Sequence, residues 1–545
     1  MKIVLISPQG SLIAYGLRQI GACLIQEGHE VQMLFLPLPE EIEPLPGKSI
    51  RHLYPGEVMD AVADRCEGVD LVGMTCATYH FPRLAALSDH LKSRITTPII
   101  WGGIHATVSP EECLQHADWI CRGEGEFAML DLVNELERGG DGRQIDNLGW
   151  RSPAGDIILN PLRPLLQDLD ALPFPLYANE GDLILHHGML QPLTPALACW
   201  YLSDGYSFGA GSAYHIWATR GCPHHCAFCC NSFYKGLYPN WNRIRRMSNE
   251  RIIAEIQHMR ASMPYIDRVA FMDDTFFAAP HAVLEDFADL YKAEVGLPFF
   301  ACASPTTLDR PRMEALVDAG LRYVWIGMQS GSPRIQELYR RHNSLERLVK
   351  TGDLLASFRD RIRTPVYDFI IDPTFQEAED QRLTLELLDR LPYPFQLALY
   401  SMTFFPGTEI ANMLPEGKRA DSSHDKNMVR LERTFYRFAL WAYGRNLPKP
   451  WLRSLSHPFL FRLLNARWLA WLWWIAGALL ESHERRQLIH WTTQHRRSVI
   501  EAHFPEEDWE AVASELFRAA PPSHPLLDRL KRTFHLRKEH KAPAE

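Results

Sequence analysis

Short apolar runs alternate with amphipathic stretches over the first 140 residues. The runs predict strands at 2–7, 29–36, 69–75, 98–103 and 118–126. Apolar positions at helical spacing predict helices at 15–27 and 82–94. Because strands separated by helices form a parallel sheet covered on both faces, residues 1–145 are predicted to be a doubly wound α/β domain. Its ligand crevice is expected beyond the carboxyl ends of the strands, in TCATYH, GGIHAT and RGEGE.

A second alternating series occupies residues 211–415. Strands are predicted at 216–221, 268–273, 298–303, 323–328, 366–371 and 395–402, and helices at 248–262, 281–294, 310–319, 344–358 and 376–390. Six such units predict a partial, TIM-like (βα)6 barrel, whose active site would lie at the carboxyl ends of the strands.

Two regions lack this alternation. Residues 146–210 are rich in proline and show no clear periodicity, so they are predicted to be a linker between the domains. Residues 416–545 have helix-like spacing and many tryptophans, and are predicted to be a helical C-terminal domain.

Composition and charge indicate the broad class of protein and its expected location. The chain has 545 residues, 46% hydrophobic and 23% charged, which is ordinary for a folded soluble protein. The net charge of −9 argues against a general nucleic-acid binder, so no nucleic-acid partner is expected. The start, MKIVLISPQG, indicates a strand and not a signal peptide, which favours a cytoplasmic location. In a reducing compartment cysteines are metal ligands or buried thiols more often than disulfides.

The sequence RGCPHHCAFCC at 220–230 gathers Cys222, Cys226 and Cys229 on one short loop. Thiolates favour soft metal centres. Three of them can each bind one iron of a cubane cluster, which leaves the fourth iron open, whereas such clusters normally have four cysteine ligands. A zinc site completed by His224, His225 or Cys230 is the main alternative.

The motif CPHHCAFC resembles the signature loop of the radical S-adenosylmethionine (SAM) enzymes. The resemblance implies that Cys222, Cys226 and Cys229 ligate a 4Fe–4S cluster. It also implies that SAM binds the fourth iron through its amine and carboxylate, and that Phe228 lies beside the adenine.

Other barrel segments are similar to those of the same family. FMDDTFF (271–277) resembles the segment that contacts the methionine amine, with Asp273 and Asp274 as candidates, although Asp274 fits a helix cap equally well. The resemblance implies that Ser304 meets the ribose, and that Gln329 stands where relatives have a glutamate. FIIDPTFQEAED (369–380) departs from the glycine-rich loop of many relatives.

The N-terminal segments resemble the cobalamin-binding, flavodoxin-like domain that precedes many radical SAM enzymes. The matching segments are GLRQIGACLIQEGHEV, IWGGIHATVSPEE and ICRGEGEFAMLDL. The motif D-x-H-x-x-G, whose histidine ligates cobalt in many relatives, is missing. The resemblance implies cobalamin contacts from the strand-end loops, at Thr75, Cys76, Gly102, Gly103, His105, Gly123, Glu124 and Gly125. For Cys76, His80 and His105 the preferred alternative is that they only pack these loops.

The C-terminal region adds two expectations. No cysteine follows Cys302, which excludes a further iron–sulfur cluster there. The run WLAWLWWIAGALL at 468–480 is too short to span a bilayer. It predicts either a helix buried over the barrel or in a subunit contact, which we favour, or an interfacial helix at a membrane surface.

Together these features predict a cobalamin-dependent radical SAM enzyme, most simply a methyltransferase acting on an unactivated carbon of a small molecule or lipid. The alternatives are a cyclase, rearrangement or oxidation enzyme with the same cofactors, and a non-catalytic sensor that binds zinc and cobalamin. An electron donor such as flavodoxin or ferredoxin is an expected partner. The sequence assigns no catalytic side chain.

Overall fold

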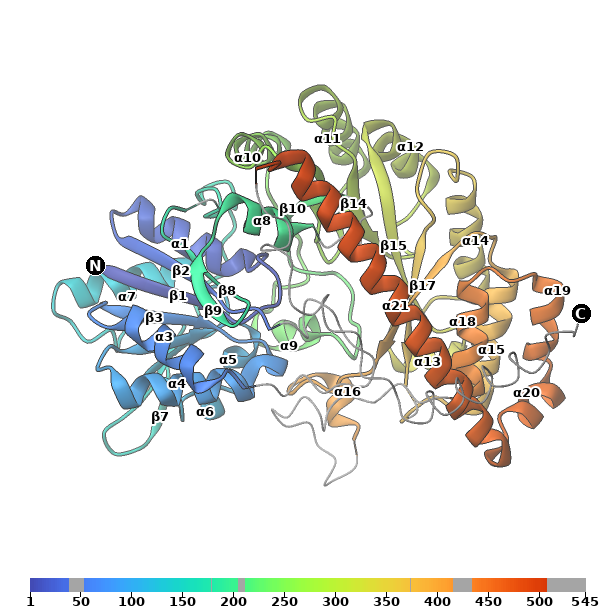
Figure 1. The fold of residues 1–545 in the computed structure, drawn as a ribbon, viewed down its shortest axis with the longest axis horizontal. Coiled ribbons are helices and arrows are strands. Elements are labelled where there is room, and N and C mark those ends of the chain that lie inside the picture. Colours follow the sequence, from blue (N-terminus) through green and yellow to red (C-terminus); the bar gives the residue numbers. More distant parts are fainter. Residues whose placement is uncertain (39–52, 178, 204–210, 373, 415–433, 507–545) are drawn as a thin grey trace, which may run out of the picture.

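The computed structural model describes residues 1–38, 53–177, 179–203, 211–372, 374–414 and 434–506. Two sheet-based domains lie side by side, and a long helix crosses the second of them diagonally (Figure 1).

A nine-stranded sheet forms the centre of the first domain. Its strand order is β7-β6-β5-β4-β3-β1-β2-β8-β9. The five strands predicted for this domain are neighbours in the sheet and are parallel, as expected for a doubly wound fold. They are β1 (Lys2–Ser7), β2 (Glu30–Phe35), β3 (Leu71–Thr75), β4 (Ile99–Gly102) and β5 (Trp119–Cys121). The chain moves from β1 to β2 on one side and then to β3 on the other. This reversal places the topological switch point, where ligands bind in such sheets, between β1 and β3.

Helices cover both faces of this sheet. Because successive strand residues point to opposite faces, Ile3 and Leu5 join one core cluster and Val4 and Ile6 the other. The first face carries α1 (Tyr15–Gln26) and α7 (Glu126–Glu137), and the second carries α3 (Gly56–Cys66), α4 (Phe81–Arg94) and α6 (Pro110–Cys113), with the short α5 (Ile104–Val108) before α6.

The segment 146–210, predicted to be a linker, contains strands that the sequence analysis did not predict. Four short strands from this region join the first sheet, each pairing antiparallel with its hairpin partner: β6 (Leu148–Arg151), β7 (Ile157–Leu159), β8 (Leu183–His186) and β9 (Met189–Pro192). Strands of three or four residues are too short to show a period, which explains why they were not predicted. Residues 161–176 do run between the domains, where the Pro173 carbonyl accepts hydrogen bonds from both Gln19 and Arg251.

The second sheet confirms the six-unit half-barrel. All its strands are parallel, in the order β10 (Ser212–Ile216), β13 (Ile266–Phe271), β14 (Phe299–Ala303), β15 (Leu321–Gln329), β16 (Val366–Ile371) and β17 (Gln396–Ser401). The connecting helices are α10 (Asn249–Ser262), α11 (His281–Glu294), α12 (Arg310–Ala319), α13 (Pro333–Leu338), α14 (Leu345–Ala356) and α15 (Ala378–Arg390). Ser248, Asp309 and Ser344 start three of these helices as side-chain N-caps.

The first barrel strand was predicted a few residues too late. Strand β10 ends at Ile216, so the predicted strand at 216–221 overlaps it by one residue. The predicted range otherwise contains β11 (Thr219–Arg220), which pairs antiparallel with β12 (Arg245–Arg246). Alternate residues of each strand point to opposite faces of this sheet. Val324, Ile326 and Met328 of β15 pack on the helices, while Tyr323 and Trp325 point to the concave side.

The described part of the C-terminal region is helical, as predicted. It contains α18 (Phe435–Gly444), α19 (Lys449–Leu452), α20 (Pro458–Leu464) and the 34-residue α21 (Ala470–His503). Helix α18 packs on the edge strand β17, and α8 (Pro195–Leu202) packs on the opposite edge strand β10. Because α21 contacts both α18 and α8, it joins the two edges of the open barrel (Figure 1).

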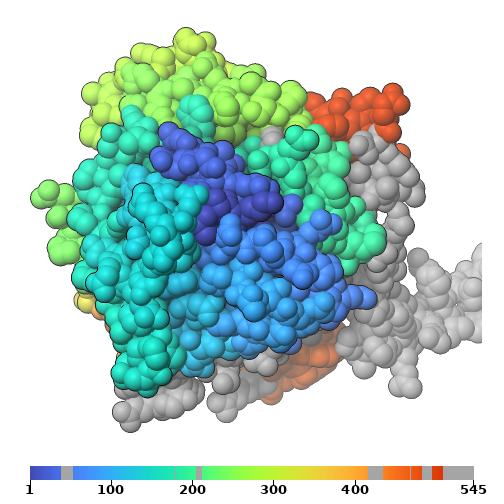
Figure 2. Space-filling view, turned by 90° about the vertical axis from the view of Figure 1, so that its left-hand side faces the viewer, coloured from blue at the N-terminus to red at the C-terminus, as the bar shows by residue number. Residues whose placement is uncertain are grey.

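A continuous core joins the two domains. One apolar cluster contains Leu17 of α1, Trp200 of α8 and Ile252 of α10. The fully buried Glu255 lies within this interface, where it accepts hydrogen bonds from Tyr15 of the first domain and Tyr214 of the second. Seen from the side of the first domain, its blue and teal atoms lie directly against the green atoms of the second (Figure 2).

Candidate active site

The cysteine loop lies at the carboxyl end of the half-barrel. It leaves the ribbon of β11 and β12 at Gly221 and ends at Cys229, the N-cap of α9 (Cys230–Leu237). Gly221 has φ +93°, and a Cβ there would lie 2.6 Å from the Trp241 carbonyl oxygen. Only glycine allows this turn, so the residue shapes the start of the loop.

The three thiols are free and mostly buried. Cys222 and Cys226 are 6% and 8% exposed, and Cys229 is half-buried. Burial raises the pKa of Cys222 to about 12 and also raises that of Cys226. The neighbouring Cys230 thiol hydrogen-bonds Cys229 and lowers the pKa of Cys229. Since a cluster is bound by thiolates, its assembly must displace the protons of the two raised thiols.

Nitrogen donors surround the sulfur atoms. Arg341 Nη1 donates to Cys226 Sγ at 3.3 Å, and Asn231 Nδ2 donates to Cys229 Sγ at 3.6 Å. The Lys235 ammonium lies close enough to interact electrostatically with all three thiols, and it donates to the His224 carbonyl. Hydrogen bonds to sulfur tune iron–sulfur clusters, so this surrounding fits a cluster with three thiolate ligands.

The described residues contain no group of three or more His, Cys, Asp or Glu side chains arranged to hold a single metal ion. In a cubane cluster each thiolate binds a different iron, so its three ligands need not converge on one point.

Asp273 and Asp274 follow β13, and both contact the cysteine loop region. Asp273 Oδ1 accepts a hydrogen bond from Thr219 Oγ1 at 2.6 Å, two residues before Gly221. Asp274 accepts from Asn231 Nδ2 at 2.9 Å. Neither caps the next helix, because the N-cap of α11 is Pro280. Burial raises the pKa of Asp273 to about 6 and raises that of Asp274 as well.

Ser304 and Gln329 each lie near one arginine, Arg341, that the sequence did not reveal. Arg341 Nη2 donates to Ser304 Oγ at 3.3 Å and to the Gly327 carbonyl oxygen at 3.1 Å, while its Nη1 contacts Cys226. Gln329 has the left-handed φ of +65°, and its Nε2 would lie 2.6 Å from a Cβ at Gly327. The candidate residues of β14, β15 and the cysteine loop are thus joined through Arg341.

Phe228 lies on the apolar side of the loop. Its ring is 5.4 Å from that of Tyr339, edge to face, and it packs against a buried cluster that includes Ile335 and Met402. The aromatic position of the motif is therefore held by packing within the barrel domain.

Asp368 is another residue that the sequence analysis did not select. Its Oδ1 is buried without a hydrogen-bond partner among the described residues. Burial raises the pKa of Asp368 to about 7, and the charge of Arg341 opposes this shift. The signal was present in VYDFII, because a charged residue inside an apolar strand is unusual for a packed core.

The candidate cobalamin residues form the carboxyl edge of the first sheet. Gly103 has φ +93°, and a Cβ there would lie 2.8 Å from the Cys76 carbonyl oxygen and 3.1 Å from Thr75 Oγ1. Gly103 is therefore required for close packing of its own loop on that of Thr75 and Cys76. A Cβ at Gly102, by contrast, would make only ordinary contact, 4.0 Å from Cys121.

Two of the candidate side chains in these loops, His105 and Cys76, point into the first domain. His105 is fully buried, with Nδ1 3.2 Å from Thr78 Oγ1 and Nε2 3.5 Å from Glu112. Cys76 is 1% exposed and belongs to the apolar core of one sheet face. Their positions match packing roles in the loops.

The loop RGEGE contacts the second domain. A Cβ at Gly123 would lie 2.0 Å from the hydroxyl of Tyr238, just beyond α9, and a Cβ at Gly125 would lie 3.5 Å from Cys121 Sγ. Glu124 accepts from Arg220 and Arg245, so its carboxylate faces the second domain. Thr107 hydrogen-bonds both the Gly123 amide and Tyr234 of α9. The helix that leaves the cysteine loop therefore rests on the carboxyl edge of the first sheet.

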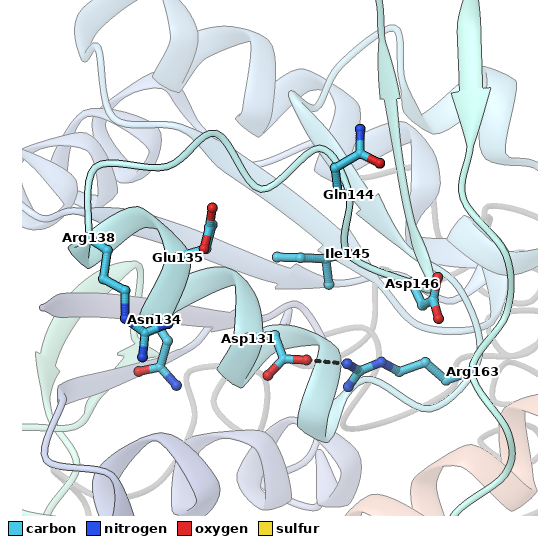
Figure 3. Close-up of a pocket in the computed structure, with 8 residues that line it drawn as sticks. All are labelled: Asp131, Asn134, Glu135, Arg138, Gln144, Ile145, Asp146 and Arg163. Carbon is cyan, nitrogen blue, oxygen red and sulfur yellow. Dashed lines mark hydrogen bonds and ion pairs between the residues drawn. The ribbon is translucent and has the colours of Figure 1, made fainter.

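One pocket on the first domain is separate from this junction. It has a volume of about 410 Å³, and Arg163 reaches across it to Asp131 of α7 (Figure 3). Polar side chains dominate its lining: Asp131, Asn134, Glu135, Arg138, Gln144, Ile145, Asp146 and Arg163. None of the candidate cofactor residues is among them.

Sequence comparison identifies both domains. Residues 1–133 match the B12 binding domain, and residues 218–380 match the Radical SAM superfamily. The chain belongs to the cobalamin-dependent radical SAM enzymes. The radical SAM domain implies a 4Fe–4S cluster and SAM, and the domain before it implies cobalamin.

Individual relatives agree with this assignment. The chain is 28% identical to an uncharacterized methyltransferase of Pyrococcus horikoshii, over 63% of this chain and 68% of that protein. It is 25% identical to the cytidylyl-2-hydroxyethylphosphonate methyltransferase of Streptomyces wedmorensis, over 64% of this chain and 68% of that protein. The fold resembles the cobalamin-dependent SAM radical enzyme OxsB, with a TM-score of 0.61 and 15% identity, over 98% of this chain and 83% of OxsB.

Proposed function

We propose that the protein is a radical SAM methyltransferase that uses cobalamin to methylate an unactivated carbon of a small molecule or lipid. One observation carries this proposal: α9, which leaves the cysteine loop, rests on Thr107 and Gly123 at the carboxyl edge of the first sheet. The two edges at which the cofactors would be held therefore face one another. The names of the two curated relatives as methyltransferases support the same activity.

The side chains at the barrel edge would then have distinct roles. Cys222, Cys226 and Cys229 would hold the cluster, and Arg341 would orient one of its thiolates while contacting Ser304. Asp273, Asp274, Ser304, Gln329 and Phe228 would surround SAM. When bound, these cofactors supply a carbon radical and a transferable methyl group, which a carbon too weakly acidic for a general base requires.

Isotope transfer tests this proposal. The reconstituted protein would be incubated anaerobically with methyl-labelled SAM, a strong reductant and fractionated small-molecule extracts. We expect label in a product other than methionine, cobalamin or the protein itself. Label recovered only in methionine, together with a changed but unlabelled product, would instead indicate a cyclase, rearrangement or oxidation enzyme.

We also propose that an acidic one-electron donor such as flavodoxin or ferredoxin reduces the cluster. The cysteine loop reaches the surface at Pro223 and His225, and His225 is influenced by the charges of Lys235 and Arg340. This basic surface next to the thiols suits an acidic partner. Reduction by flavodoxin should slow as ionic strength rises, whereas reduction by a small chemical reductant should depend on it much less.

A membrane surface is the partner we propose for the C-terminal region. Residues 447–480 contain no Asp or Glu, although the chain as a whole has a net charge of −9. Trp451, Phe459, Trp468 and Trp471 are each more than 60% exposed there, at the edge of the molecule away from the first domain (Figure 1). Exposed tryptophan beside basic residues is typical of interfacial helices. No helix among the described residues is long and apolar enough to cross a membrane.

Vesicle sedimentation tests this contact. We expect binding to phosphatidylglycerol vesicles, weaker binding to phosphatidylcholine, and loss of both with Trp468→Ala/Trp471→Ala. Met189→Ala, which removes an equally exposed side chain from the first domain, is the control. Equal sedimentation of the double variant and the parent would reject the proposal.

A further inference from the structure

Four charged side chains join the two domains next to the cysteine loop. Arg220 contacts Glu124 Oε1 at 3.2 Å through Nη1 and Glu126 Oε1 at 2.5 Å through Nη2. Arg245 Nη1 contacts the same Glu124 oxygen at 2.7 Å. Glu124 Oε2 accepts from the Leu166 amide at 2.8 Å, so both its oxygens are used. We call these residues, Arg220, Arg245, Glu124 and Glu126, the bridge.

The bridge connects the two segments that matter most for cofactor placement. Arg220 lies two residues before Cys222, Glu124 belongs to the loop after β5, and Glu126 is the first residue of α7. Arg220 and Arg245 stand directly opposite each other in the β11–β12 ribbon. Like charges in that arrangement repel, so the ribbon depends on the two glutamates of the other domain for its neutralisation.

The bridge is largely removed from solvent. The side chains of Arg245 and Glu126 are 5% and 7% exposed, and those of Glu124 and Arg220 are 16% and 18% exposed. A buried ion network adds little net stability compared with apolar packing, because its groups lose their hydration. Such networks can instead select one arrangement of two surfaces, since any other leaves a buried charge without a partner.

Association of the domains has a separate basis. The apolar core that contains Leu17, Trp200 and Ile252 includes neither the bridge residues nor the three thiols, and the hydrogen bonds to Glu255 are also made without the bridge. That interface can hold the domains together without the bridge. It does not by itself fix the ribbon that carries the thiols.

We propose that the bridge is a positioning device that sets the distance and orientation between the iron–sulfur cluster and the corrin. This inference rests on the proposed placement of both cofactors at the facing sheet edges. Arg220 would act through the loop it precedes, Glu124 through the loop between β5 and α7, and Glu126 through the first turn of α7. All four are positioning residues and not catalytic ones.

Electron paramagnetic resonance of the holoenzyme tests the proposal. The reduced cluster and cob(II)alamin are both paramagnetic, and the relaxation of the cobalamin signal depends steeply on their separation. In the parent we expect faster relaxation of that signal when the cluster is reduced. In Glu124→Gln/Glu126→Gln, which keeps the shape of both side chains, we expect loss of this enhancement in protein that holds both the cluster and cobalamin.

Arg220→Gln should give the same loss, and Arg220→Lys, which retains the charge, should restore part of the enhancement. Arg361→Gln removes an exposed arginine that pairs with Asp318 far from the junction, and it should behave as the parent. If Arg220→Gln fails to retain iron, the glutamate double variant still decides, because its changes lie in the first domain.

Parent-like relaxation in the glutamate double variant with both cofactors bound would overturn the proposal. So would the lack of any interaction in the parent. Failure of the methyltransferase proposal is a different result: label would not reach a product, yet the magnetic interaction and its dependence on the bridge would persist.

Discussion

The carboxyl edges of the two parallel sheets both face the domain junction, but they expose different groups. The first edge consists mainly of small residues and backbone, its Glu124 is paired with arginines of the second domain, and His105 is turned inward and fully buried. The second gathers thiols, Arg341, Asp273 and Asp368, several of them with pKa values shifted by burial. The first suits a large flat ligand held by shape, and the second suits small charged groups held by hydrogen bonds.

Removing a thiol should cause the largest difference between the two edges, because it should abolish the function of the second edge and leave the first unchanged. Cys226→Ala removes one proposed cluster ligand, so we expect complete loss of SAM cleavage and of stoichiometric iron. Cobalamin binding should remain, because the first edge contains none of the three thiols. Iron and sulfide analysis measures the cluster content, and a hydroxocobalamin titration measures cobalamin binding. Loss of cobalamin binding in a folded variant would show that the edges are not independent.

A methyl group at Gly123 should disturb the first edge instead. Gly123→Ala places a Cβ 2.0 Å from the Tyr238 hydroxyl at a residue with φ +74°, which should cost about 2–5 kcal/mol of unfolding free energy from overpacking and backbone strain. Urea unfolding measures this, and weaker hydroxocobalamin binding should accompany it. Tyr238→Phe in the same chain removes the hydroxyl and should recover part of the loss. No recovery would assign the cost to backbone strain alone.

Ionisation of Asp273, on the second edge, should make the unfolding free energy of the protein depend on pH. Its folded pKa of about 6 lies above the ordinary 3.8, so the folded protein retains a proton that the unfolded chain loses. Stability should therefore fall as the pH rises from about 4 to about 6, by up to about 3 kcal/mol from this group, and then level off. Asp273→Asn should remove this slope while keeping an oxygen for Thr219. Urea unfolding at several pH values compares the two proteins, and identical slopes would contradict the assignment.

Arg341→Gln should have the smallest effect of the four, restricted to the second edge. The change removes the donors to Cys226, Ser304 and Gly327, but no ligand. Loss of such a supporting contact typically costs 10–100-fold in activity, so we expect SAM cleavage to fall by about this factor. Cobalamin affinity should not change. A fully active variant would show that Arg341 only packs the loop.

Much of the fold was predictable because it depends on local pattern. The periods of the apolar positions located β16 exactly as 366–371 and the helices α11 and α12 as 281–294 and 310–319. The strands of residues 146–192 were missed because each is only three or four residues long. The three thiols of the cysteine loop could be predicted because they lie on one short loop, so their spacing is visible in the sequence. Arg341 was missed because it lies in a loop after α13, 112 residues beyond Cys229, and no local pattern marks it.

The sequence by itself determined the two α/β units, the cysteine loop after the first barrel strand and the family to which they belong. These features depend on neighbouring residues, whose spacing is preserved in the linear chain. The tertiary structure decided the partners: Glu124 with two arginines of the other domain, Asp273 with Thr219, and Gly123 beneath Tyr238. Such contacts join residues about 50 to 120 positions apart, and they arise only when packed elements bring two sheet edges together.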